Sequence, residues 1–229
     1  MADVQVADVR RLIDGLRWDR RRHPYHGRRE YSQCAWAVAG AIGDMIDAGD
    51  AANAGPLARR AVERVTAALM YMDDSSGGVG DDLRSLMVLY ARACRAAPPD
   101  VMRLAAWLVS MQLDGPGWPA IELKEFAEPL GDCGLAEVAR LTEERSATSD
   151  PDSWPAQWGI KNLREQLAAV SGDVDAHVAV LAEDLRGAHR YSDIVEVLRA
   201  AARHEGAEQW ARKGLPQAPP RRPAGGGLG

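Results

Sequence analysis

Apolar side chains recur every three or four residues along almost the whole chain, and no segment alternates cleanly between apolar and polar residues. A period near 3.6 is typical of amphipathic helices, whereas strict alternation is typical of half-buried strands. The pattern therefore predicts an all-α protein. We expect helices over residues 6–18, 30–48, 55–72, 83–94, 101–111, 120–130, 134–145, 158–170, 174–185, 191–204 and 206–214.

Polar breaks divide this helical pattern. The longest, SATSDPDSWPAQ at 146–157, predicts a linker between an N-terminal helical array (1–145) and a C-terminal helical-repeat part (158–215). The tail at 216–229 is rich in Pro and Gly, a low-complexity composition that predicts disorder.

Short turns between successive amphipathic helices favour antiparallel hairpins stacked as an α-solenoid, like tetratricopeptide or HEAT repeats. No strict repeat period is visible, so we expect the repeats to be degenerate.

Composition and charge narrow the range of functions. The 229 residues are 46% apolar and carry a net charge of -5, so no global basic field points to nucleic acid. The N-terminus lacks the apolar core of a signal peptide, and the longest nearly apolar run (34–43) is too short to span a bilayer. We therefore expect a cytoplasmic protein that has no membrane partner. The Arg and Ala bias suggests a GC-rich bacterial source.

The three cysteines, at 34, 94 and 133, lie far apart in or beside helical patterns. We interpret them as small buried apolar residues in a reducing compartment. Phe occurs once, and seven tryptophans take its place. We expect Trp36, Trp107 and Trp210 in the core. The tryptophans at 118, 154 and 158 lie near loops, where they line a groove or pack against helix ends, and we favour the second reading.

Several segments together resemble the region that follows the zinc finger in actinobacterial SWIM zinc-finger proteins. The segments that carry the resemblance are DVRRLIDGL (8–16), DDSSGG (73–78), PPDVMRLAAWL (98–108), PLGDCGLAEVARL (129–141), SGDVDAHVAVLAEDL (171–185) and YSDIVEVLRAAARHEGAEQWARKGL (191–215). The last segment reads like a tetratricopeptide hairpin with Ala207, Trp210 and Ala211 on its packing face. The resemblance covers roughly residues 6–215.

The zinc finger of that family needs a Cys-x-Cys pair followed by a Cys-x-His pair, and this chain has neither. No zinc ligand is therefore carried over. The resemblance implies a helical scaffold beside a finger that binds DNA or protein, and it implies no reaction.

The loop and first helical turn DDSSGGVGDDLR (73–84) are the stretch closest to a motif. Oxygen-rich residues between two helices suggest a calcium loop, but Arg84 stands at the twelfth position, where a bidentate Glu is required. We interpret the segment as a tight connection in which glycines adopt positive φ and Asp81 or Asp82 caps the next helix.

No signature of a catalytic nucleophile, a metalloprotease, a redox dithiol or a dinucleotide-binding loop occurs in the chain. The sequence therefore predicts no catalytic residue, metal ligand or cofactor, and no enzyme activity.

One basic cluster remains as a candidate contact site. It consists of Arg20, Arg21, Arg22, Arg28 and Arg29, with Tyr25 inside it and no acidic residue between 20 and 29. Arginines mixed with aromatic residues suit phosphate contact and base stacking, and they equally suit an acidic protein partner or a solvated loop.

The sequence as a whole favours a non-catalytic helical-repeat scaffold that binds another protein. The alternative is a nucleic-acid-associated module that uses the arginine-rich segment.

Overall fold

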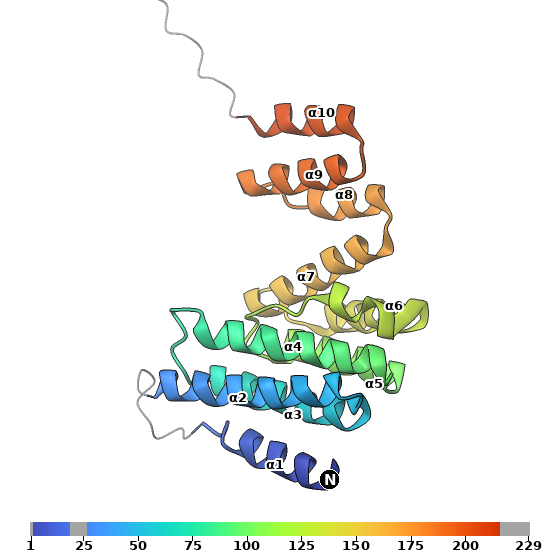
Figure 1. The fold of residues 1–229 in the computed structure, drawn as a ribbon. Coiled ribbons are helices and arrows are strands. Elements are labelled where there is room, and N and C mark those ends of the chain that lie inside the picture. Colours follow the sequence, from blue (N-terminus) through green and yellow to red (C-terminus); the bar gives the residue numbers. More distant parts are fainter. Residues whose placement is uncertain (1, 19–26, 216–229) are drawn as a thin grey trace, which may run out of the picture. The chain divides into compact units, whose positions relative to one another are not determined.

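In the computed structural model, residues 2–18 and 27–215 are described. In this part of the chain all regular structure is helical and no strand occurs, as the sequence predicted. The ten helices (Figure 1) are α1 (Ala2–Asp14), α2 (Arg28–Asp47), α3 (Ala51–Leu69), α4 (Gly78–Ala96), α5 (Val101–Asp114), α6 (Leu123–Thr148), α7 (Trp154–Ser171), α8 (Val174–Ala182), α9 (Ala188–Ala200) and α10 (His204–Gly214).

The chain divides into two units, Met1–Val170 and Ser171–Gly229, with separate hydrophobic cores. The sequence placed the division earlier, at 146–157. In the structure that stretch covers the end of α6, a turn at 149–153 and the start of α7, all inside the first unit. Arg164 of α7 pairs with Glu143 of α6 at 2.6 Å, and Leu163 is fully buried in the first core, so α7 belongs with the helices before it.

The core of the first unit is built on α3, which packs against α2 and α4 (Figure 1). Ala54, Ala58 and Ala61 of α3 are completely buried. Alanine costs no side-chain entropy in a helix and leaves room for a close neighbour. The Ala-rich sequence therefore lets these helices approach closely.

Helix α2 shows how the period selects the buried face. Its buried residues are Tyr31, Ala35, Val38, Ile42 and Met45, which alternate spacings of four and three. Cys34 and Trp36, one position to either side of Ala35, are exposed instead. One residue is a turn of about 100° around a helix, so these neighbours point away from the core.

We expected Trp36 and all three cysteines to be buried. This prediction is wrong for Trp36 and Cys34. Cys133 is exposed as well. Cys94 and Trp107 are buried, as predicted.

Helix boundaries differ from the sequence prediction where turn chemistry decides them. α4 begins at Gly78 because the Asp74 carboxylate accepts hydrogen bonds from the backbone N–H groups of Val79 and Gly80, at 3.0 and 2.8 Å. Asp74 is thus the residue that caps α4, and the expectation of a cap at Asp81 or Asp82 is wrong. The expected positive φ is present at Gly77.

The predicted break between helices 120–130 and 134–145 is present within α6. Gly131 has a φ of 54° and a ψ of -172°, which are not helical values. Glycine tolerates this conformation because it has no Cβ.

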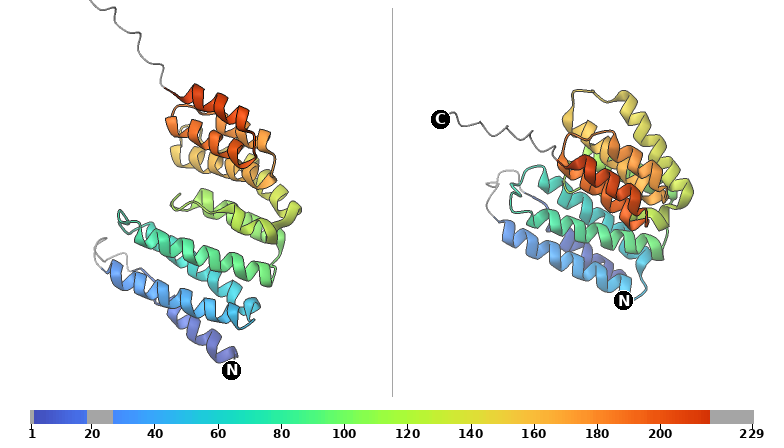
Figure 2. Two further views of the ribbon diagram at one scale, coloured as in Figure 1. Left: turned by 45° about the horizontal axis from the view of Figure 1, so that its top comes forward. Right: turned by 90° about the horizontal axis from the view of Figure 1, so that it is seen from above.

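The second unit contains α8, α9 and α10, of which α9 packs against both others (Figure 2). Its core consists of Leu181, Ile194, Val195, Leu198 and Ala207. The expected packing face of α10 is correct for Ala207, which is buried, and for the half-buried Trp210. It is wrong for Ala211, which is exposed because the single helix α9 covers only a narrow face of α10.

Candidate functional site

Two tryptophans flank the N-terminal half of α4 in the first unit. Trp36 comes from α2 and is 73% exposed, yet its indole is held in place. Its Nε1 donates a hydrogen bond of 2.6 Å to Oδ1 of Asp82 on α4. An exposed, oriented indole offers a large contact area that loses little conformational entropy when a partner binds.

Asp82 is a buried carboxyl at this position. Its side chain is only 5% exposed, and its Oδ2 has no hydrogen-bond partner among the described residues. Burial raises the pKa of Asp82, the side chains of Ser32 and Trp36 oppose this shift, and the carboxylates of Asp74 and Asp81 add to it. The Trp36 indole therefore stabilises the charged form of this carboxyl.

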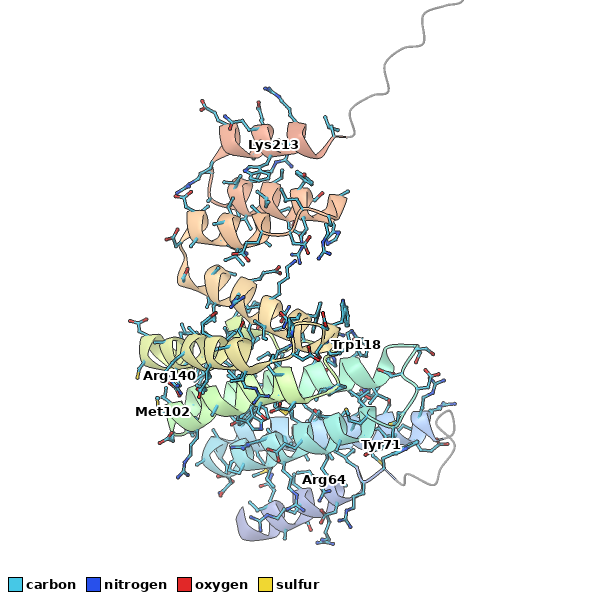
Figure 3. The ribbon with its side chains drawn as sticks, turned by 180° about the vertical axis from the view of Figure 1, so that it is seen from behind. Arg64, Tyr71, Met102, Trp118, Arg140 and Lys213 are labelled. Carbon is cyan, nitrogen blue, oxygen red and sulfur yellow. The ribbon has the colours of Figure 1, made fainter. Side chains whose placement is uncertain are left out.

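Trp118 flanks α4 on the other side, from the connection between α5 and α6 (Figure 3). Its six-membered ring lies against Gly80, so closely that a Cβ at position 80 would come within 2.4 Å of two ring carbons. The Arg84 guanidinium lies 5.4 Å from the ring centroid. The indole of Trp118 can pack against α4 here because Gly80 has no side chain.

The exposed strip of α4 runs between the two tryptophans. Asp82 faces α2 and Gly80 faces Trp118, so the exposed residues Asp81, Ser85 and Val88 lie between them. We call the surface formed by Trp36, Asp81, Ser85, Val88 and Trp118 the tryptophan-flanked surface. Asp81 is the charged residue among these five, and its carboxylate is paired with the neighbouring Arg84 of α4.

A pocket lies beneath Trp118, between α3, α4, α5 and the connection from α5 to α6. Its free interior measures about 90 Å³, and the whole hollow, including the space open to solvent at its mouth, about 660 Å³. Its walls are mainly apolar, and the principal apolar side chains are those of Leu83, Met87, Val88, Met111, Trp118, Ile121 and Phe126. Such a lining is typical of sites that hold the apolar part of a ligand.

Two of the polar side chains that line this pocket are buried. Thr66 of α3 is 9% exposed and Gln112 of α5 is 3% exposed. The hydroxyl of Thr66 and the Nε2 amide nitrogen of Gln112 are closed to solvent, and neither has a partner among the described residues. Buried polar groups are nearly always hydrogen-bonded in folded proteins, so two unpartnered groups in one pocket are unusual.

The connection between α5 and α6 is fixed from two sides. Oε1 of Gln112 accepts a hydrogen bond of 3.0 Å from the N–H of Ile121. Gln166 of α7 donates to the Ile121 carbonyl at 2.8 Å and accepts from the Leu123 N–H at 2.6 Å. The bond to Ile121 orients the Gln112 amide: its oxygen faces the Ile121 N–H, and its NH₂ group therefore points away from Ile121.

Sequence reasoning did not identify Thr66 and Gln112, although both carry a signal. Each is a polar residue four positions after a fully buried apolar one, Val62 and Leu108. Since residues four apart share a helix face, this spacing places both side chains toward the core.

The structure describes two of the five arginines in the predicted basic contact. Arg20, Arg21 and Arg22 lie outside the described residues. Arg28 donates to the Asp73 carbonyl at 2.9 Å, and both Arg28 and Arg29 line a hollow between the starts of α2 and α4. Asp74 lines the same hollow, so its charge is mixed.

A second hollow combines basic and aromatic side chains at the end of α1 and the end of α3. Arg17 and Trp18 line it from one side, and Arg64 and Tyr71 from the other (Figure 3 labels the last two). Trp18 also meets Tyr31 edge to face, with ring centroids 5.9 Å apart. Cationic and aromatic groups in one hollow are suited to phosphates and stacked bases.

The remaining candidate chemistry is weak. The described residues contain no group of three or more His, Cys, Asp or Glu side chains that could hold a metal. Burial raises the pKa of the Cys94 thiol to about 11, which leaves little reactive thiolate at neutral pH.

Trp154 is 73% exposed and stacks on Trp158, with centroids 6.4 Å apart, rather than packing onto a helix end.

Comparison with known proteins adds no identification. No family model, curated protein or solved structure gives a significant match to the chain. Among the helices in the described part of the chain, none has the length and apolar character needed to cross a membrane.

Proposed function

We propose that this chain is a non-catalytic helical interaction module that binds another protein through the tryptophan-flanked surface. The observation that carries the proposal is the pair of tryptophans, Trp36 and Trp118, held in place beside an exposed strip of α4. Tryptophan is enriched among the residues that dominate binding energy in protein interfaces.

The chemistry of the surface indicates the kind of partner. Asp81 and Arg84 neutralise each other, and Arg92 further along α4 pairs with Asp47 at 2.7 Å. Electrostatic attraction therefore contributes little, and the partner is a protein segment that presents apolar or aromatic side chains to the two indoles.

We further propose that the helix pairs form a degenerate α-solenoid, which would present such a surface on a repeated scaffold. Support comes from the packing of consecutive helices as pairs: α2 with α3, α5 with α6, and α9 with α10. The resemblance to the helical region of SWIM zinc-finger proteins implies the same kind of scaffold, beside a finger that this chain lacks.

The first prediction concerns Trp36. Replacing Trp36 with Ala is expected to weaken partner binding about 30-fold, because a central tryptophan contributes about 2 kcal/mol or more. Tagged protein would be used to capture partners from the host lysate, with and without nuclease, and bound proteins would be quantified by mass spectrometry. Trp154→Ala is the matched control, because Trp154 is equally exposed, at 73%, but lies on α7.

A second variant separates binding from folding. Trp36→Ala removes the hydrogen bond to buried Asp82, whereas Ser85→Arg places bulk and charge on the exposed strip without breaking a core contact. Both variants should lose the same nuclease-resistant partner while their circular dichroism stays helical. Capture of that partner at the parent level by both variants would exclude this surface.

The second candidate function is nucleic-acid binding, and the hollow formed by Arg17, Trp18, Arg64 and Tyr71 is the observation that favours it. Each phosphate contact adds to the salt dependence of binding. The triple replacement of Arg20, Arg21 and Arg22 by Glu is therefore expected to abolish salt-sensitive binding to single-stranded DNA, and Arg64→Glu to weaken it about tenfold.

Fluorescence anisotropy at several salt concentrations measures this binding. Arg140→Glu is the control, because Arg140 lies on α6 and is paired with Glu137 and Glu144 (Figure 3). Equal binding by the parent, the triple variant and Arg64→Glu would reject the nucleic-acid hypothesis.

A further inference from the structure

We propose that the pocket beneath Trp118 binds a small neutral molecule that has an apolar body and a hydrogen-bond acceptor, such as the oxygen of a ketone or amide. The acceptor would be received by the hydroxyl of Thr66 and the NH₂ group of Gln112. This inference is independent of the proposed protein interface, because it rests on groups inside the first unit.

The two unpartnered groups set the chemistry of the ligand. The Gln112 oxygen is already used by the Ile121 N–H, so Gln112 has only N–H donors to offer. Thr66 lies inside α3, where a threonine hydroxyl often bonds the carbonyl four residues earlier, but its hydroxyl has no such bond. Two donors in one pocket call for an acceptor on the ligand.

A second buried threonine, Thr142, shows how a helix of this fold can satisfy a buried threonine hydroxyl. Thr142 is completely buried in α6, and its hydroxyl donates to the Val138 carbonyl at 2.7 Å. The hydroxyl of this buried threonine is therefore satisfied within its own helix. Leaving Thr66 and Gln112 unpartnered costs free energy that a ligand with a suitable acceptor recovers.

The size and charge of the pocket limit the ligand further. An apolar cavity of about 150 Å³ accommodates benzene, whereas the free space inside this pocket is about 90 Å³, so a ligand with a single ring fits only when one wall moves. Glu122 and Glu125 lie at the rim with Arg84. Each of these three charges is already paired within the chain, so together they favour a neutral ligand. The pairs are Arg84 with Asp81, Glu122 with Lys124, and Glu125 with Arg95.

Entry requires one wall to move, because both donors are closed to solvent in the structure. Trp118 is the wall residue best suited to this. It is 42% exposed, and it rests on Gly80 and Arg84 by ring contacts.

Acetophenone and toluene are the probes for this proposal, because they share a ring and differ in the carbonyl. Dissociation constants would be measured on the full chain by NMR titration of ¹³C-labelled methionine methyl groups. Met87 and Met111 line the pocket and should shift, whereas Met102 on the exposed face of α5 should not (Figure 3). Acetophenone is expected to bind about fivefold more tightly than toluene.

Three variants test the donors. Thr66→Val and Gln112→Glu should remove the preference for acetophenone, and Gln112→Glu keeps an oxygen for the Ile121 N–H. Thr142→Val is the matched control and should retain the preference. Because Thr66→Val deletes an unpartnered hydroxyl at nearly constant shape, it should fold at least as well as the parent chain.

Several outcomes would overturn the proposal. Methionine signals of the pocket that respond to neither probe would mean that water alone enters it. An unchanged preference in both donor variants would show that Thr66 and Gln112 do not receive the carbonyl. Tighter binding of benzoate than of acetophenone would contradict the neutral class of ligand.

Discussion

Replacing Phe126 with Ala is expected to lower the free energy of unfolding of the first unit by about 3–5 kcal/mol. Phe126 is the only phenylalanine in the chain and is 1% exposed. Its ring lies 5.8 Å from that of Tyr90, and it forms part of the pocket wall. The variant loses the burial of a whole ring and leaves a cavity that the surrounding helices only partly refill.

Urea denaturation followed by circular dichroism measures this change. Met102→Ala on α5 is the control, and because Met102 is 45% exposed we expect it to lose less than about 1 kcal/mol. A loss at Phe126 no larger than that at Met102 would mean that the pocket region is not part of the cooperative core.

The helical architecture could be predicted because burial on a helix leaves a regular trace in the sequence. The buried stripe of α2, from Tyr31 to Met45, is such a trace. This periodicity does not show whether each residue beside the stripe is buried or exposed. Trp36 was expected in the core because it lies beside an apolar stripe, but its side chain points outward, where its indole N–H donates to the Asp82 carboxylate of another helix.

The pocket could not be predicted in the same way, because its walls come from segments that are distant in sequence. Thr66 and Gln112 are separated by 46 positions and meet only after α3 and α5 have packed. The unit boundary was missed for a similar reason, since the polar stretch at 146–157 gives no sign of the pairing between Glu143 and Arg164 or of the burial of Leu163, which tie α7 to the first unit.

Two glycines inside helices are expected to respond to alanine in opposite directions. A Cβ on Gly134 in α6 would come within 2.7 Å of Cγ1 of the half-buried Val101 on α5 and 2.9 Å of Cβ of the buried Leu130. A Cβ on Gly40 in α2 would meet nothing within 4 Å. Alanine is favoured over glycine in a helix by about 1 kcal/mol, so the surrounding space decides the sign.

We therefore expect Gly40→Ala to raise the free energy of unfolding by about 1 kcal/mol and Gly134→Ala to lower it by about 2 kcal/mol. Denaturant unfolding of both variants beside the parent chain measures the difference. Because the intrinsic gain is the same at both positions, the difference between the variants isolates the cost of overpacking at the contact of α5 with α6. A stabilised Gly134→Ala variant would contradict this contact, and with it the close packing that brings the α5–α6 connection over the pocket.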